Sequence, residues 1–345
     1  MSSIQRLFGN LFGAFALSLA AVSVQAAPIV LKVASPWPEK HPANVYGPEL
    51  FMKDVTEATH GAVKFEFYPA GQLGKPATAL QLLESGGIDL LLVAPPYTPD
   101  KLPLSEVGGL PGMGTSACQV SRSMLKLLGP DGILTKAEYG PLGLHPLYDG
   151  SPPAYEVMTS KKRVTSLADM KGLRLKAAGG PEADALRALG AVPVQMNSVD
   201  VYQSVQTGVL DGRIGPFASV PALHEEKIFH YGTVGAAVGN FVAVFAINEN
   251  KWKSLPKDVQ VAIEHAARSA QEKSCKFWDE TGQKTIHELS EKDGWKLHHL
   301  TAKQQQHWLK VMEPVQKKWA SDMDKAGKPG TKVLEAMKAA LSETH

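Results

Sequence analysis

The sequence predicts an α/β protein of two lobes, each a mixed sheet flanked by helices, from three observations. Residues 172–217 alternate between short extended runs and helical patterns. Residues 79–97 repeat the same order on a smaller scale. About 320 residues follow the N-terminal segment, which is enough for two domains of common size.

The stretch 172–217 is expected to form the centre of one lobe. Its strands and helices alternate because glycines punctuate it and Ser198 is a suitable N-cap residue. In open α/β sheets, ligands bind beyond the carboxyl ends of the strands, so Lys176 and the Gly215-Pro216-Phe217 turn should border one crevice. The expected segments are, in order, strand 173–177, helix 181–189, strand 192–194, helix 198–208 and strand 209–215.

The earlier stretch 79–97 follows the same plan. Its helix ends in a small residue plus glycine, and an apolar-Asp pair then begins a buried strand. This unit ends in Pro96-Tyr97, as the later unit ends in Pro216-Phe217. Two lobes that face each other would place these loops on opposite walls of a cleft, which is the shape of a ligand trap.

The first 26 residues are typical of a secretory signal. Arg6 precedes an apolar run over residues 11–24, and small residues end it at Val24-Gln25-Ala26. The alternative is a retained membrane anchor, but the run is shorter than the roughly 20 residues that a spanning helix needs. We therefore expect an exported chain, cleaved after Ala26.

The elements of the first lobe can be placed in chain order. The Pro-rich segment after the first strand cannot continue it, so Trp37 should stand in a loop and line a cleft, or else pack beneath the next helix. The alternation of Val63, Phe65 and Phe67 indicates a half-buried strand. The expected elements are strand 29–34, helix 44–60, strand 63–67, helix 76–84, a buried strand after Gly86 and helix 116–128.

Two crossings are expected between the lobes. Proline and glycine crowd residues 142–153, and residues 155–159 then begin the second lobe. The wholly apolar run 241–248 is typical of a strand buried on both faces and should carry the chain back. The predicted division is 27–150 plus 242–281 for lobe I and 151–241 plus 282–345 for lobe II.

A long helix should follow the second crossing. If it extends from Ser254 to Lys292 it is roughly 55 Å long at about 1.5 Å per residue, so it must touch both lobes or bend, and Gly282 is the expected bend. Thr301 and Gln304 then form a capping box for a last helix, which Pro314 kinks or interrupts.

Charge and cysteine content narrow the functional classes. The net charge is +2, and +1 after loss of Arg6, which creates no field for nucleic acid or an anionic membrane surface. Cys118 and Cys275 make neither a disulfide framework nor a CxxC motif, so we expect two isolated, partly buried thiols, with a bridge as the alternative. No residue spacing matches a metal site, and no cofactor is expected.

Four segments, found in order along the chain, resemble the solute-binding proteins of TRAP (tripartite ATP-independent periplasmic) transporters, DctP type. The resemblance implies a two-lobed periplasmic binding protein of type II with a long helix across both lobes. It also implies a monomeric periplasmic receptor that closes on a small organic acid and delivers it to a membrane permease. The four segments are AGQLG at 70–74, LADMKGLRLK at 167–176, LGA at 189–191 and VYQSVQTGVLDG at 201–212.

The resemblance also suggests where the ligand is held. Family members commonly carry an arginine, whose planar fork binds a carboxylate, at the position of Lys176. Lysine can still bind a carboxylate, but it orients the anion less strictly. Arg174 lies on the same face of the strand, although the family pattern implies that this position is solvated.

Two departures from the family pattern bear on the ligand. Gly215 stands where many relatives carry an asparagine, and the segment around Tyr155 lacks an arginine that is often found there. Fewer forked cations and more aromatic surface from Trp37, Tyr97, Tyr155 and Phe217 favour a monocarboxylate with an apolar or aromatic body over a small dicarboxylate. Asn240, before the return strand, could also reach the cleft.

Two other functions remain open from the sequence. A ligand sensor that signals to a membrane kinase would have the same fold but a different partner, and neighbouring genes would distinguish it from a transport receptor. An exported enzyme is disfavoured, because the sequence has no GxSxG, HExxH or SxxK motif to supply a nucleophile with its base.

Overall fold

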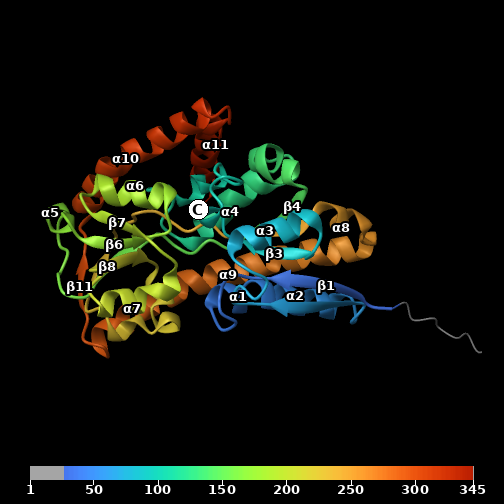
Figure 1. The fold of residues 1–345 in the computed structure, drawn as a ribbon, viewed down its shortest axis with the longest axis horizontal. Coiled ribbons are helices and arrows are strands. Elements are labelled where there is room, and N and C mark those ends of the chain that lie inside the picture. The colour runs from blue at the N-terminus through green and yellow to red at the C-terminus, as the bar shows by residue number, and fades with distance from the viewer. Residues whose placement is uncertain (1–26, 345) are drawn as a thin grey trace, which may run out of the picture.

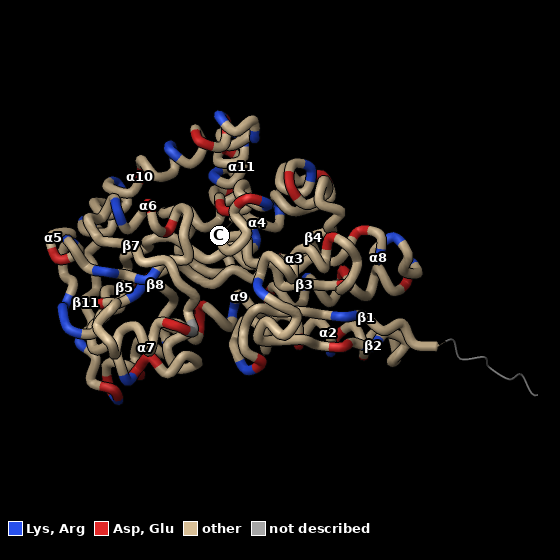
Figure 2. The backbone as a smooth tube through the Cα atoms, viewed as in Figure 1, with Lys and Arg blue, Asp and Glu red and all other residues tan. Residues whose placement is uncertain are grey.

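A computed structural model describes residues 27–344 and divides their strands between two sheets (Figure 1). The predicted export signal, residues 1–26, lies outside the described residues. Among the helices of 27–344, none is long and apolar enough to cross a membrane. Basic and acidic residues are interspersed over both lobes in the view of Figure 2.

The first sheet has five strands in the order β2-β1-β3-β10-β4. β1 pairs in parallel with β2 and β3, whereas β10 runs antiparallel between β3 and β4. Every residue of β3 and β10 is buried, as their continuous apolar sequences predict. The bounds are β1 Ile29–Ala34, β2 Val63–Tyr68, β3 Leu90–Val93, β4 Leu144–Asp149 and β10 Val244–Asn248, with helices α1 Pro42–Val45, α2 Pro48–Ala58, α3 Pro76–Ser85, α4 Ala117–Leu128 and α8 Glu249–Ser254.

The second sheet has six strands in the order β11-β9-β5-β8-β6-β7. The parallel set β8-β6-β7 holds the central stretch of the sequence, and β5 runs antiparallel to both β8 and β9. Both sheets are therefore mixed, as predicted. The bounds are β5 Glu156–Thr159, β6 Arg174–Ala177, β7 Val192–Gln195, β8 Gly212–Gly215, β9 Tyr231–Val234 and β11 Lys296–His299, with helices α5 Leu167–Met170, α6 Gly180–Ala188 and α7 Val201–Gln206.

The two crossings between the sheets run side by side. The Tyr155 backbone N–H donates to the Gly239 carbonyl at 2.7 Å, and the Val238 N–H donates back to the Tyr155 carbonyl at 3.0 Å. Nearer the first sheet, the Gly150 N–H donates to the Ala243 carbonyl at 2.7 Å. Any movement of one lobe against the other must therefore bend two hydrogen-bonded segments together.

The long helix α9, Lys257–Glu291, connects the lobes at a third place. It packs against α2, α4 and β4 of the first lobe and against the short 3₁₀ turn Phe217–Ser219 of the second. Figure 1 shows α9 running from the first lobe into the second. The helix is continuous through Gly282.

The C-terminal helices return to the first lobe. α10, Ala302–Lys325, begins with the predicted capping box of Thr301 and Gln304, continues through Pro314, and packs on α6. α11, Gly330–Ser342, packs on α4, and its Met337 joins the buried cluster of the first sheet. The sequence-based division placed all of 282–345 in lobe II, whereas α11 lies against lobe I (Figure 1).

Cys118 and Cys275 form a disulfide, which corrects our expectation of isolated thiols. The two residues are 157 positions apart, and only the packing of α4 on α9 brings their Cα atoms within 4.7 Å. Around the disulfide, Asp279 of α9 accepts from the backbone N–H groups of Ala117 and Cys118, and Arg122 pairs with Glu272 at 2.6 Å. The first half of α9 is thus fastened to lobe I.

The disulfide should make a measurable contribution to stability. We expect the double variant Cys118→Ser/Cys275→Ser to lose about 2–4 kcal/mol of unfolding free energy in urea denaturation, because the bridge constrains a long loop of the unfolded chain. A reducing agent should lower the stability of the wild type to that of the variant and leave the variant unchanged. Equal stabilities of oxidised wild type and variant would contradict this expectation.

Candidate ligand-binding site

A cavity lies between the two lobes, against the crossings and α9. The first lobe contributes the loop after β1 and the turn after β3, and the second contributes β8 and the residues that follow it. The volume that the centre of a water-sized sphere can occupy in this cavity is about 60 Å³. By the same measure a single water molecule needs roughly 10–15 Å³, so the cavity can hold a small molecule. The lining residues are Trp37, Pro38, His41, Ala43, Tyr97, Gly150, Pro152, Tyr155, Ser198, Arg213, Pro216, Ser219, Leu223, Phe241, Ala243 and Trp278.

Aromatic rings form a continuous wall of this cavity. Phe241 of the return crossing contacts Trp37 edge-on at 5.7 Å between ring centroids and Tyr97 at 5.3 Å. Trp37 stacks on His41 at 6.1 Å, and His41 reaches Trp278 of α9 at 6.3 Å. These contacts join lobe I, a crossing and the long helix in one apolar surface.

Arg213, on β8, is the one permanently charged side chain among the described residues that line the cavity. It is 3 % exposed, forms an ion pair with Glu225 at 2.5 Å and donates to the Ser219 hydroxyl at 2.8 Å. A Cβ atom on Gly215 would lie 2.2 Å from Nη1 of Arg213. The missing side chain at Gly215, on the same face of β8, therefore makes room for the guanidinium.

Lys176 lies beside Arg213 but does not line the cavity. The two residues are in register on the neighbouring strands β6 and β8, and Lys176 is 2 % exposed. Burial lowers the pKa of Lys176, and the charge of Arg213 lowers it further, while Glu182 acts in the opposite direction. The Lys176 side chain is thus buried in the second lobe, beside Arg213.

Glu225 is the counter-ion of this cationic pair. Burial raises its pKa to about 7, while the charges of Arg213 and Lys176 act to lower it. Without a partner, a buried guanidinium would be costly, and Glu225 supplies that partner at ion-pair distance. The carboxylate and the Ser219 hydroxyl together orient Arg213 at the cavity wall.

Tyr97 and Ser198 approach the cavity from opposite lobes. Burial raises the pKa of the Tyr97 phenol to about 12, and its interaction with the Ser198 side chain partly offsets this rise. The turn after β3 and the segment after β7 therefore face the same cavity.

The predicted site residues separate into two groups. Trp37, Tyr97 and Tyr155 line the cavity. Lys176 and Gly215 lie immediately behind its wall, around Arg213.

Phe217 and Asn240 serve other contacts. Phe217 is buried against Trp295 in the core of the second lobe and lines a wider groove on the far side of Trp278. Asn240 donates from Nδ2 to the carbonyls of Gly108 and Met113, both at 3.2 Å, and so ties the return crossing to lobe I. Arg174 is exposed and pairs with Asp211 at 2.8 Å, as the family pattern implies for its position.

The lining residues that went unpredicted include His41, Ser198, Arg213, Ser219 and Trp278. A signal for Arg213 was present, because it is a charged residue in a short buried strand, two positions before the glycine that closes the strand. Positions 213 and 215 lie on the same face of the strand, so the absence of a side chain at Gly215 indicates that the side chain of Arg213 occupies that space.

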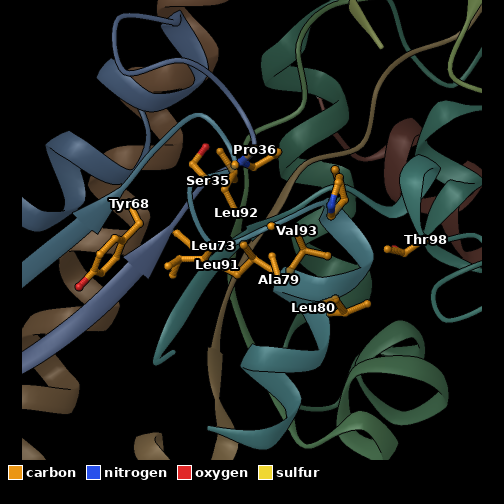
Figure 3. Close-up of a pocket in the computed structure, with 15 residues that line it drawn as sticks. Ser35, Pro36, Tyr68, Leu73, Ala79, Leu80, Leu91, Leu92, Val93 and Thr98 are labelled. Carbon is orange, nitrogen blue, oxygen red and sulfur yellow. The ribbon is translucent and has the colours of Figure 1, made fainter. Parts of the chain in front are cut away.

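A second pocket lies inside lobe I, beneath α3 and the ends of β1 and β3 (Figure 3). Its lining is mostly aliphatic, with Leu80, Leu91 and Val93 around it, and no Asp, Glu, Lys, Arg or His is among the described residues that line it. Its volume by the same measure is about 10 Å³, close to that of one water. The interlobe cavity is therefore the candidate site.

A two-sheet fold with paired crossings and an interlobe cavity defines a two-lobed ligand-binding protein. The family model described as "Bacterial extracellular solute-binding protein, family 7" matches residues 33–322, which is most of the chain. The chain belongs to this family, the DctP-type solute-binding proteins of TRAP transporters, which are binding proteins rather than enzymes.

Three relatives illustrate the range of the family. The C4-dicarboxylate-binding periplasmic protein DctP of Rhodobacter capsulatus is 27% identical, over 98% of this chain and 99% of that protein. A TRAP solute-binding protein from a marine metagenome, specific for aromatic acids and solved with 3-hydroxybenzoate, has a TM-score of 0.84 at 23% identity and covers 92% of this chain and 99% of its own. A third, from Sulfitobacter sp. NAS-14.1 with β-D-galacturonate, has a TM-score of 0.76 at 20% identity over 90% and 99% of the two chains.

Glu106 of lobe I places a buried carboxyl group against lobe II. It is 6 % exposed and lies against Gly180 at the start of α6, where a Cβ atom would be 2.8 Å from its Oε2. Burial, and then the nearby carboxyl of Glu182, raise the pKa of Glu106 to about 8. The folded state therefore keeps a proton on Glu106 that the unfolded chain releases near pH 4.5.

This shift predicts a pH-dependent loss of stability. Since the folded state binds more protons, Glu106 should cost stability increasingly as the pH rises from about 4.5 to about 8. We expect Glu106→Gln to be more stable than wild type at pH 8.5, by up to about 5 kcal/mol, and equal to it near pH 4.5. Urea denaturation across this pH range measures the difference in unfolding free energy between the two proteins. The other buried carboxyl groups are the same in both proteins, so their contributions cancel. A constant difference at all pH values would refute the assignment.

Proposed function

We propose that this chain is the periplasmic receptor of a TRAP-type transporter and that it captures a monocarboxylate with an aromatic or otherwise apolar body. The observation that carries the proposal is the lining of the interlobe cavity. One guanidinium, that of Arg213, stands among five aromatic side chains, Trp37, Tyr97, Tyr155, Phe241 and Trp278. A single fixed cation favours one carboxylate, and the rings favour a flat apolar body.

Arg213 is the proposed anchor for the carboxylate. Guanidinium groups bind carboxylates through parallel hydrogen bonds, and Glu225 and Ser219 already fix the orientation of this one. Lys176, in register on the adjacent strand, adds positive charge from behind. The sequence-based assignment of Lys176 as the direct contact stays a prediction.

The proposed mechanism is closure of the two lobes without chemistry. Arg213 belongs to lobe II, while Trp37 and Tyr97 belong to lobe I, so a ligand that touches all three binds the closed form better than the open form. Only such differential affinity can shift the population toward closure. The membrane permease would then recognise the closed form.

The remaining parts of the proposal concern the setting of the receptor. Export through the predicted signal, with cleavage after Ala26, would place the mature chain in the periplasm as a monomer. The relative bound to 3-hydroxybenzoate supports an aromatic acid as ligand class. The C4-dicarboxylate-binding relative represents the competing class.

A ligand screen tests the substrate class. We expect benzoate, 3-hydroxybenzoate and phenylacetate to raise the melting temperature of the mature protein and to change its tryptophan fluorescence, since Trp37 and Trp278 line the cavity. Succinate and malate should have little effect, because a second carboxylate would be buried against aromatic rings without a cation. Stabilisation by C4 dicarboxylates alone would overturn the ligand assignment and leave the receptor assignment standing.

Paired substitutions test the anchor. Arg213→Gln/Glu225→Gln removes both charges of the buried pair, so it avoids an unpaired carboxylate, and we expect it to fold but to bind benzoate about 100-fold more weakly. Lys176→Met, which keeps the volume of a side chain outside the cavity, should stay within about tenfold of wild type.

Isothermal titration calorimetry measures both affinities, and melting temperatures monitor the fold. Glu225→Gln alone serves as the matched control, because it retains Arg213. A larger loss of affinity for Lys176→Met than for the double variant would show that Lys176, and not Arg213, is the main carboxylate-binding residue.

A further inference from the structure

His41 brings a polar group of lobe I to the ligand cavity. It follows the loop after β1 and is the N-cap residue of α1. Its Nδ1 atom accepts a hydrogen bond from the backbone N–H of Ala43 at 3.2 Å. Because Nδ1 acts as the acceptor, the proton of the neutral imidazole must lie on Nε2.

The His41 ring is held in place and kept neutral. It stacks on Trp37 with an interplanar angle of 21° and lies 6.3 Å from Trp278 between ring centroids. Burial, and then the positive charge of Arg213, lower the pKa of His41 to about 4. The imidazole is therefore an uncharged donor at neutral pH, and it is close enough to Arg213 to respond to its charge.

The Nε2–H group has a place in the wall but no acceptor there. Within residues 27–344, the hydrogen bond to Ala43 accounts for Nδ1 only. The neighbouring side chains in the wall, Trp37 and Trp278, are donors themselves. Because His41 lines the cavity and is only partly buried, its Nε2–H can donate to an oxygen atom of whatever occupies the cavity.

We infer that the Nε2–H of His41 donates to one oxygen of the ligand carboxylate while Arg213 binds the other, so that a single anionic group is shared between the two lobes. The inference rests on the proposed function and deepens it. His41 belongs to lobe I and Arg213 to lobe II, so the carboxylate becomes the point at which closure is sensed. His41 is then a ligand-binding residue as well as a helix cap.

Two substitutions separate these roles. In His41→Asn, the side-chain oxygen replaces Nδ1 and keeps the cap of α1, but nothing replaces Nε2. In His41→Gln, the amide N–H₂ reaches the position of Nε2, but the cap is lost. The inference therefore predicts the order of affinity wild type, then His41→Gln, then His41→Asn, with His41→Asn weaker than wild type by about 10-fold to 100-fold. The order of melting temperature should be the opposite for the two variants.

The experiment is isothermal titration of the mature protein and both variants with benzoate, phenylacetate and lactate, together with melting curves. If the wild type binds at least one acid and His41→Asn binds it as tightly as His41→Gln or more tightly, the inference is wrong and the proposed function stands. If the wild type binds none of the three, the proposed function fails and this inference fails with it. Weaker binding by His41→Asn than by His41→Gln supports the inference, whatever the two stabilities are.

Discussion

A charged guanidinium inside a protein is tolerated only when neighbouring groups neutralise and hold it, and the cavity of this receptor is built around one such group. Glu225 pairs with Arg213 at 2.5 Å, and Ser219 accepts a further hydrogen bond from it. Gly215 leaves the space into which the guanidinium folds. Gly215 at the end of β8, and Ser219 and Glu225 after it, thus fix the cation before any ligand arrives, so that ordering it costs the ligand little.

The rest of the fold decides which surfaces meet this cation. The paired crossings and α9 connect the lobes at adjacent places, and the disulfide fastens one half of α9 to lobe I. The aromatic wall runs from Trp37 through Phe241 to Trp278, that is, from lobe I across a crossing to the helix. The hinge therefore forms part of the cavity floor, and a bound molecule rests on the elements that must move.

The sequence was sufficient for elements whose pattern is local. Alternation and apolar runs located β1, β6 and β10 to within a few residues, and glycines marked the ends of α3 and α6. The loops carrying Trp37 and Tyr97 could be placed at the cavity because chain reversals at strand ends must face the crevice. These predictions needed no knowledge of which elements pack together.

Predictions failed where distant segments had to meet. The Cys118–Cys275 bridge depends on the angle at which α4 lies on α9, and the return of α11 to lobe I depends on the length and direction of α10. The appearance of Arg213 in the cavity wall depends on the register between β6 and β8, while the role of Lys176 as a ligand contact stays a prediction. Residue types at strand ends identify candidates for a site, but the packing of neighbouring strands selects which cation reaches the cavity.

The two lobes contribute different chemical groups to the cavity, and this limits the kind of molecule that can contact both of them. The cation of the cavity comes from lobe II, whereas Trp37 and Tyr97 come from lobe I and Phe241 from a crossing. A bare carboxylate would bind Arg213 and, by the inference above, His41, but would leave the aromatic rings of lobe I in contact with water. An apolar molecule without a carboxylate would cover the rings but leave the cation without its anion. In the proposed mechanism closure requires contacts with both lobes at once, so we expect that only a molecule with a carboxylate and an apolar body at a fixed separation gains the full free energy of closing.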